Sequence, residues 1–238
     1  MHFNTSFETA ISVPRFAVYK RIAGNDQKAW DLYRWNLDLV SSLGPLSCDF
    51  EVALRNTIHN QLSNHFGRED WWASNSLILD DATHRAIAQI VRKHQKKIAA
   101  QRVGPGKVVA DLMLGTWVMI LGRGGASDIG RTVNYDTQLW LPALRKGFAI
   151  GTLTPKGRIR RPARNLAHLR ASNFRTLRNR SAHHEPIFDG ILQDGTSTRI
   201  SLADVRDQTI EMLSWMSPDL AAVHAADSNF ANVRANRP

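Results

Sequence analysis

The stretch QKAWDLYRWNLDLV (27–40), followed closely by DFEVALRNTIHNQL (49–62), decides the fold class. Apolar residues recur in both at steps of three or four: Trp30, Tyr33, Leu37 and Val40 in the first, and Phe50, Leu54, Ile58 and Leu62 in the second. This period places each set on one face of an α-helix. Gly44 and Pro45 lie between the stretches and predict that one helix ends and another begins there.

The rest of the chain predicts more helices and few strands. Helices are expected at Asp81 to Ala100, Val108 to Leu121, Thr137 to Ala149, Arg158 to Leu177 and Leu202 to Trp215, with a flexible loop from Leu121 to Gly130. Alternation of apolar and polar residues is scarce, and only a short hairpin around Ile187 to Ile200 is expected. The predicted fold class is therefore all-α, a single helical domain over residues 1–225 with a flexible tail at 226–238.

Composition narrows the class of protein. A 238-residue chain with 43% hydrophobic residues is able to cover a sizeable core. The single cysteine, Cys48, forms neither an internal disulfide nor a zinc cluster by itself, which favours a reducing cytoplasm. The N-terminus lacks the features of a signal peptide, and the longest apolar stretch, Val108 to Leu121, is too short to span a bilayer. No membrane association is expected.

The net charge of +10 is concentrated in one segment. No Asp or Glu lies between Asp136 and Glu185, and this interval holds eleven basic residues: Arg145, Lys146, Lys156, Arg158, Arg160, Arg161, Arg164, Arg170, Arg175, Arg178 and Arg180. The remaining chain is nearly neutral, with 20 basic and 21 acidic residues. Positive charge without interspersed carboxylates attracts phosphates, so the segment predicts a polyanion site. The alternative is a solvated basic face.

The basic segment ends in FRTLRNRSAHHEPIF (174–188). In the helix expected before it, a cationic face is formed at steps of three and four by Arg164, His168, Ala171, Arg175 and Arg178. That face leads to His183 and His184. Histidine titrates near neutrality and serves as base or acid, whereas arginine stays charged and stabilises a phosphorane. The pattern therefore suits cleavage of RNA through attack of the ribose 2′-hydroxyl.

Plainer interpretations exist for the same residues. His183 also fits a structural role at a helix end, and Arg178 fits a salt bridge with Glu185. The adjacent His183, His184 and Glu185 lack the HExxH spacing of a metal site, so no metal is expected. GPGK at 104–107 lacks the spacing of a phosphate-binding loop, which argues against a nucleotide-triphosphate enzyme.

The segment RNRSAHHEP (178–186) resembles the signature of the Abi-like proteins, of the AbiD and AbiF type, in the HEPN ribonuclease superfamily. Five further stretches follow the order typical of that family: ISVPRFAVY near the N-terminus and AWDLYRWN, then FEVALRN at Phe50 to Asn56, GTWVMIL and EMLSWMSPDL. The resemblance covers roughly Ile11 to Leu220.

The resemblance implies a HEPN-type helical bundle with additional N-terminal helices, acting as a metal-independent endoribonuclease without a cofactor. It implies a homodimer and a toxin role in phage defence by abortive infection, and some relatives associate with a structured non-coding RNA. Arg178 would bind the scissile phosphate, His183 would be the acid or base, and Asn179 would orient the pair, with possible support from His184, Glu51 and Arg55. The expected RNA-binding residues are Arg158, Arg160, Arg161, Arg164, Arg170, Arg175 and Arg180.

Two other functions stay open on the sequence. One is a non-catalytic RNA-binding module that holds a structured non-coding RNA. The other is an interaction factor whose basic face docks an acidic antitoxin, which would show salt-sensitive protein binding.

Overall fold

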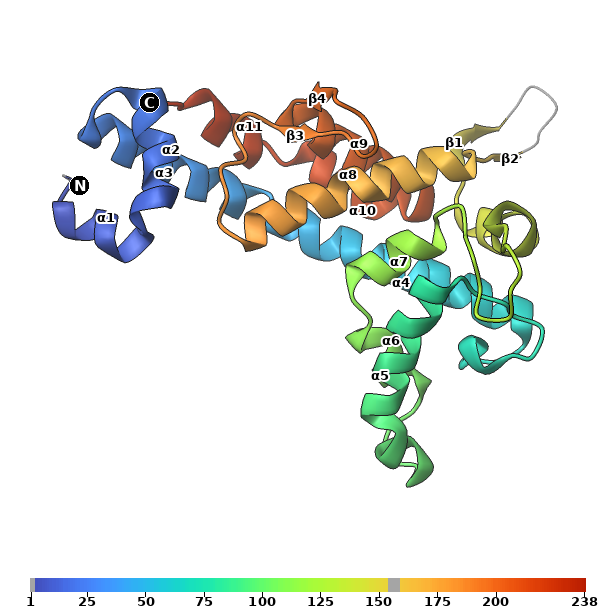
Figure 1. Cartoon of the computed structure of the whole chain (residues 1–238). Coiled ribbons are helices and arrows are strands. Elements are labelled where there is room, and N and C mark those ends of the chain that lie inside the picture. The colour runs from blue at the N-terminus through green and yellow to red at the C-terminus, as the bar shows by residue number, and fades with distance from the viewer. Residues whose placement is uncertain (1–2, 154–158) are drawn as a thin grey trace.

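The computed structural model describes residues 3–153 and 159–238 and is mostly helical, as the sequence predicts (Figure 1). The α-helices are α1 (Thr5–Ile11), α2 (Val13–Ala23), α3 (Asp26–Ser42), α4 (Gly44–Phe66), α5 (Asp81–Ala99), α6 (Pro105–Asp111), α7 (Leu114–Ile120), α8 (Arg164–Ala182), α9 (Leu202–Met216), α10 (Pro218–Ala226) and α11 (Asn229–Ala235). Short helical turns are η1 (Trp71–Ala73), η2 (Asp136–Trp140) and η3 (Leu144–Gly147). Two antiparallel hairpins pair β1 (Ile150–Leu153) with β2 (Ile159–Arg160) and β3 (Ile191–Leu192) with β4 (Arg199–Ile200).

Local signals set several helix boundaries. The side chain of Asn25 accepts the Lys28 N–H at 2.8 Å and caps α3, and that of Asp80 accepts two N–H groups at the start of α5. Gly44 and Pro45 open α4 directly after α3, so the predicted boundary is confirmed. The hairpin expected near Ile187 to Ile200 is also confirmed, as β3 and β4.

Three predicted helices differ from the structure. The stretch 108–121 forms two short helices because Leu112 and Met113 adopt extended backbone between α6 and α7. The stretch 137–149 is helical only in η2 and η3, with Pro142 between them. The described start of α8 is Arg164, after Pro162, and its end lies beyond Leu177, at Ala182.

The sequence also missed the β1–β2 hairpin. Residues 226–238, expected as a flexible tail, contain α11, whose Phe230 is buried. The Trp35 indole N–H donates to the Val233 carbonyl at 2.7 Å, which ties α11 to α3.

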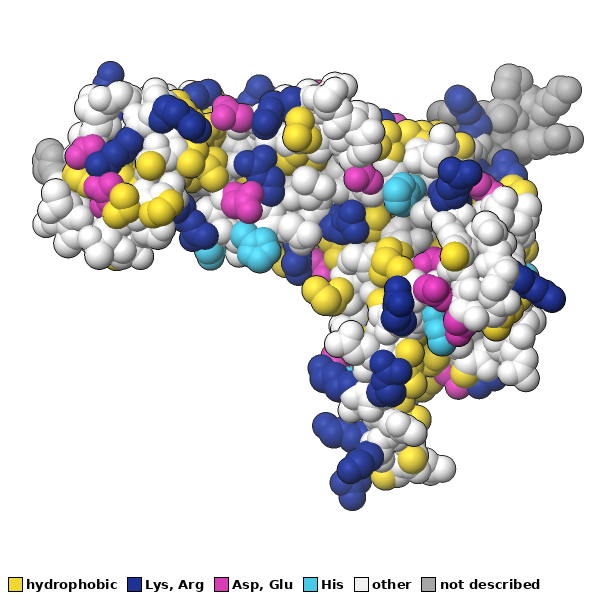
Figure 2. Space-filling view, in the orientation of Figure 1, with side chains coloured by type: hydrophobic (Ala, Val, Ile, Leu, Met, Phe, Trp, Pro, Cys, Tyr) yellow, Lys and Arg dark blue, Asp and Glu magenta, His cyan; other side chains and the backbone are white. Residues whose placement is uncertain are grey.

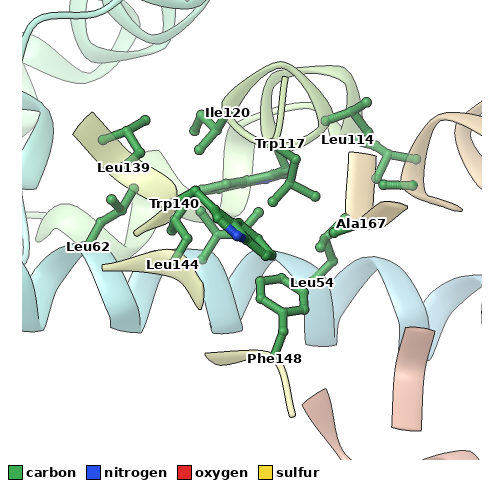
Figure 3. Packing of buried hydrophobic residues seen from close by; sticks show 14 of the residues in the cluster. Leu54, Leu62, Leu114, Trp117, Ile120, Leu139, Trp140, Leu144, Phe148 and Ala167 are labelled. Atoms are coloured by element: carbon green, nitrogen blue, oxygen red, sulfur yellow. The ribbon is translucent and has the colours of Figure 1, made fainter. Parts of the chain in front are cut away.

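Apolar residues form two buried clusters. The larger one surrounds α4 and α7 and includes Trp117, Trp140 and Phe148, which pack closely in Figure 3. The smaller one joins α2 and α3 to α9 and α11. Helix α8 belongs to both, because Phe174 lies in the larger cluster and Leu177 in the smaller one. The last turns of α8 are therefore held where the two clusters meet.

The elements build an L-shaped molecule (Figure 1). Helices α3, α4, α8 and α9 run along one limb, with α1 and α2 at its end, and α5 and α6 project from the other end as a separate limb. Among the described residues, no helix combines the length and apolarity that a membrane span requires.

Candidate functional site

The RNRSAHHEP segment begins inside α8 and ends the helix with a defined cap. The His184 N–H donates to the Ser181 carbonyl at 3.0 Å, and the Glu185 N–H donates to the Arg180 carbonyl at 2.9 Å. These two bonds make a Schellman cap, in which one residue takes the left-handed backbone conformation. That residue is His184, with φ of 55°, where glycine is usual. Pro186 follows two residues later, and a proline at that place does not continue the helix.

The loop after the cap is fixed by Arg180. Its guanidinium donates to the Gly190 carbonyl at 2.9 Å and to the Pro186 carbonyl, and its Nε lies 3.2 Å from a Glu185 carboxylate oxygen. Gly190 itself has φ of 74°, and a Cβ there would meet the Ile200 carbonyl oxygen at 1.9 Å. Arg180 therefore links the end of α8 to the loop leading into the β3–β4 hairpin.

Asn36 of α3 holds the same loop from the other side. Its side chain is fully buried; its Oδ1 accepts the Ile187 N–H at 2.9 Å and its Nδ2 lies 3.4 Å from the Glu185 carbonyl oxygen. A buried amide whose oxygen and nitrogen both have partners holds the loop in one conformation, because breaking either bond leaves a buried polar group unpaired. The AWDLYRWN stretch thus contacts the RNRSAHHEP segment directly.

Arg178 lies against α4. Its Nε is 3.4 Å from a carboxylate oxygen of Glu51, and both side chains are partly exposed, at 39% and 29%. One turn earlier, Phe174 packs on Phe50 with ring centroids 4.4 Å apart. The alternative pair of Arg178 with Glu185 is wrong, since Glu185 pairs with Arg180. Arg55, one turn beyond Glu51, has a buried Nε without a hydrogen-bond partner among the described residues.

Arg178 also borders an apolar pocket of about 290 Å³ at the turn from α3 to α4. Leu43, Leu46 and Cys48 line it on one side, and Leu177 and Ala182 on the other. It lies between the two apolar clusters, beside the last turn of α8.

His183 is the residue that follows the last turn of α8, and its side chain is exposed. Asn179 is exposed too, and its backbone carbonyl accepts the His183 N–H at 2.9 Å. Arg178 and His183 both reach solvent at this end of the helix, but no hydrogen bond joins their side chains in the part of the chain that the structure describes. Figure 2 shows histidine at the surface near the end of α8, among basic and acidic side chains.

The predicted cationic face of α8 is only partly open. Ala171 is fully buried, and burial lowers the pKa of His168. Arg164 lies 2.9 Å from Asp136 and donates to the Leu121 carbonyl at 3.0 Å. The contacts of Arg164, Arg170 and Arg180 with protein groups favour structural roles, since Arg170 also forms an ion pair with Glu211 at 2.8 Å.

The other predicted RNA-binding residues are less engaged. Arg160 is exposed, Arg161 is half-buried with a long bond of 3.4 Å to the Arg145 carbonyl, and Arg175 is half-buried. Arg158 lies outside the described residues. Three or more metal-ligating side chains do not gather anywhere in residues 3–153 and 159–238.

The site thus contains an arginine in an ion pair with one carboxylate, an exposed histidine five residues later and an adjacent apolar pocket. Comparison with protein-family models, curated proteins and solved structures finds no match. The interpretation of the site therefore rests on its own residues and on the motif resemblance.

Sequence reasoning missed Asn36 and the structural role of Arg180. A signal for Asn36 was present, because it interrupts the apolar face of α3 between the buried Leu32 and Leu39. A polar residue at such a position needs a buried partner. Nothing in the sequence near Arg180 distinguishes it from the neighbouring arginines, so its contacts were not predictable.

Proposed function

We propose that this protein is a HEPN-type endoribonuclease that cleaves RNA by attack of the ribose 2′-hydroxyl, without a metal ion. The observation that carries the proposal is the exposure of Arg178 and His183 at one end of α8, in a chain segment whose charge is strongly positive. Arg178 would stabilise the phosphate in the transition state, and His183 would transfer a proton. In the same proposal, α3, α4, α8 and α9 form the HEPN bundle, with α1 and α2 as the additional N-terminal helices.

Each chain would supply one well-placed histidine, while the reaction needs both a base and an acid. A homodimer would bring a second copy of the site to the same RNA by two-fold symmetry. The cytoplasmic toxin role in phage defence, a regulating antitoxin and a structured non-coding RNA partner belong to this proposal through the motif resemblance.

The first test compares His183→Ala with His65→Ala, an exposed histidine of α4 that serves as the matched control. Labelled RNA is incubated with each purified variant in EDTA, and the ends are examined for 2′,3′-cyclic phosphate. We expect the wild-type protein and His65→Ala to cleave and His183→Ala to bind RNA without cleaving. Equal cleavage by His183→Ala would remove His183 from the mechanism, and cleavage of RNA whose 2′-hydroxyls are replaced by hydrogen would refute the reaction.

The ion pair between Glu51 and Arg178 supplies a second test. A partly exposed pair contributes about 0–1 kcal/mol, so an RNA phosphate is able to replace the carboxylate as the partner of Arg178. Glu51→Gln should therefore bind RNA up to about five-fold more tightly. Unchanged affinity in Glu51→Gln, together with unchanged affinity in Arg178→Gln, would show that Arg178 does not contact RNA.

The second candidate function is a binding module in which the same site holds a structured RNA without cutting it. The Schellman cap favours it, because His183 and His184 then have a structural role at the end of α8 and neither needs to transfer a proton. Stable binding of RNA with intact ends after long incubation of the wild-type protein would support this function and refute the enzyme. Salt-sensitive binding of an acidic protein with little affinity for RNA would point to the interaction factor instead.

A further inference from the structure

We propose that the limb formed by α5 and α6 (Asp81–Asp111, hereafter the arm) is a second RNA-binding surface, which grips the phosphate backbone at a distance from the candidate cleavage site. The proposal rests on the proposed function only in taking RNA as the polyanion. It requires binding of RNA and does not require cleavage.

The charge of the arm is the first observation. Residues 82–110 contain no Asp or Glu and seven basic residues: Arg85, Arg92, Lys93, Lys96, Lys97, Arg102 and Lys107. All seven side chains are exposed. Figure 2 shows Lys and Arg gathered over the free end of the arm. The arm is thus a positive surface comparable in charge density to the segment around α8, where several arginines are engaged by protein groups.

The layout of α5 is the second observation. Ile87 and His94 are buried on one side, whereas Arg85, Arg92 and Lys96 follow each other at steps of seven and four on the opposite side. Lys93 and Lys97 form a neighbouring row with the same four-residue step, which corresponds to about 6 Å along the helix axis. Rows of cations at this spacing present several donors to one phosphate backbone at once.

The free cations of the arm are the third observation. Asp111, the last residue of α6, binds Lys93 at 2.9 Å and Lys107 at 2.8 Å. Within residues 3–153 and 159–238, no carboxylate forms an ion pair with Arg92, Lys96, Lys97 or Arg102. These four side chains can meet phosphate without first breaking an internal salt bridge.

The arm is also held firmly at its base, which suits a surface that positions a ligand. Asp80, which caps α5, accepts a hydrogen bond from the Tyr135 hydroxyl at 2.6 Å. Within the arm, His94 of α5 lies 2.8 Å from the carboxylate of Asp111 of α6, which joins the two helices. In the view of Figure 1, the arm and the end of α8 lie on the two sides of the inner angle of the L. A folded RNA in that angle would contact the arm through its backbone while one strand reaches the end of α8.

The test uses the triple variant R92Q/K96Q/K97Q. Its matched control is R15Q/R21Q/K28Q, which removes three exposed cations from α2 and α3 at the other end of the molecule. Fluorescence anisotropy measures the Kd of both variants for a 5′-labelled RNA hairpin with a stem of about 20 base pairs, over a range of salt concentrations. His183→Ala is the background for every variant, so that RNA ends stay intact.

We expect the arm variant to bind at least ten-fold more weakly than the control near physiological salt. Its plot of log affinity against log salt should also be shallower, by about 0.7–0.9 for each phosphate that the variant no longer neutralises. Equal affinities and equal slopes for the two variants would overturn the proposal. It would also be overturned if the arm variant lost affinity for an acidic protein in the same assay while its affinity for RNA stayed unchanged. Failure of the enzyme proposal would be recognised separately, by intact RNA in the presence of the wild-type protein.

Discussion

Arg180→Ala tests whether this arginine of the RNRSAHHEP segment builds the loop after α8 or binds RNA. The substitution removes two hydrogen bonds to backbone carbonyls, one to Gly190 at 2.9 Å and one to Pro186, and the ion pair with Glu185 at 3.2 Å. A hydrogen bond from a charged donor contributes about 1.5–3 kcal/mol, and a partly exposed ion pair about 0–1 kcal/mol.

The expected loss of stability follows from those interactions. Arg199 also lies 3.4 Å from the Gly190 carbonyl oxygen and would still satisfy it in part, so the loss falls near the lower end of the range. We expect the free energy of unfolding of Arg180→Ala to fall by about 3 kcal/mol. Urea denaturation followed by circular dichroism measures it, with Arg175→Ala, a half-buried arginine on the same helix, as the control. The control should change by less than about 1 kcal/mol.

RNA binding separates the two roles of Arg180. If it is structural, Arg180→Ala should retain the wild-type salt dependence of RNA binding at temperatures where the variant is folded. The reasoning is refuted if stability is unchanged while RNA affinity and the salt slope both fall, because Arg180 would then be a phosphate ligand.

Three further predictions concern the loop and the arm. His184→Gly should raise the free energy of unfolding by up to about 1 kcal/mol, measured in urea, because glycine adopts the left-handed backbone without strain; a loss of stability would contradict the cap. Asn36→Ala should cost about 2–4 kcal/mol in the same assay, since it leaves the Ile187 N–H unpaired and opens a cavity, whereas a cost below 1 kcal/mol would not fit a buried anchor. Hydrogen bonds from Lys107, then Lys93 and His94, hold the pKa of Asp111 well below its usual range. The stability from this depressed pKa is fully present above about pH 4 and is lost as the pH falls through the folded-state pKa, so acid titration of stability should show a smaller loss in Asp111→Asn than in the wild-type protein.

Helices with a strong apolar period were predictable from their own residues. In α4 the predicted apolar face and the Gly44–Pro45 break are both confirmed, because burial of one helix face and the missing proline N–H act locally. The predicted face of α3 is wrong in part: Tyr33, Leu37 and Val40 are only half-buried. Helix α3 carries a second apolar row, Leu32, Trp35 and Leu39, and packing buries that row. The sequence also located the segment on which the candidate site is built. The stretch 108–121 was not predictable, because an apolar run carries no signal for the extended backbone at Leu112 and Met113.

The partners of the charged residues, by contrast, are known only from the folded chain. The sequence shows eleven cations before Glu185 but not that Arg180 reaches back to the loop, that Arg178 meets Glu51, or that Arg164 meets Asp136. A long charged side chain has many possible partners, and only packing of α4, α8 and the loops selects one. For the same reason, the sequence shows the basic residues of the arm, but only the fold shows that Arg92, Lys96, Lys97 and Arg102 form no ion pair within the described residues.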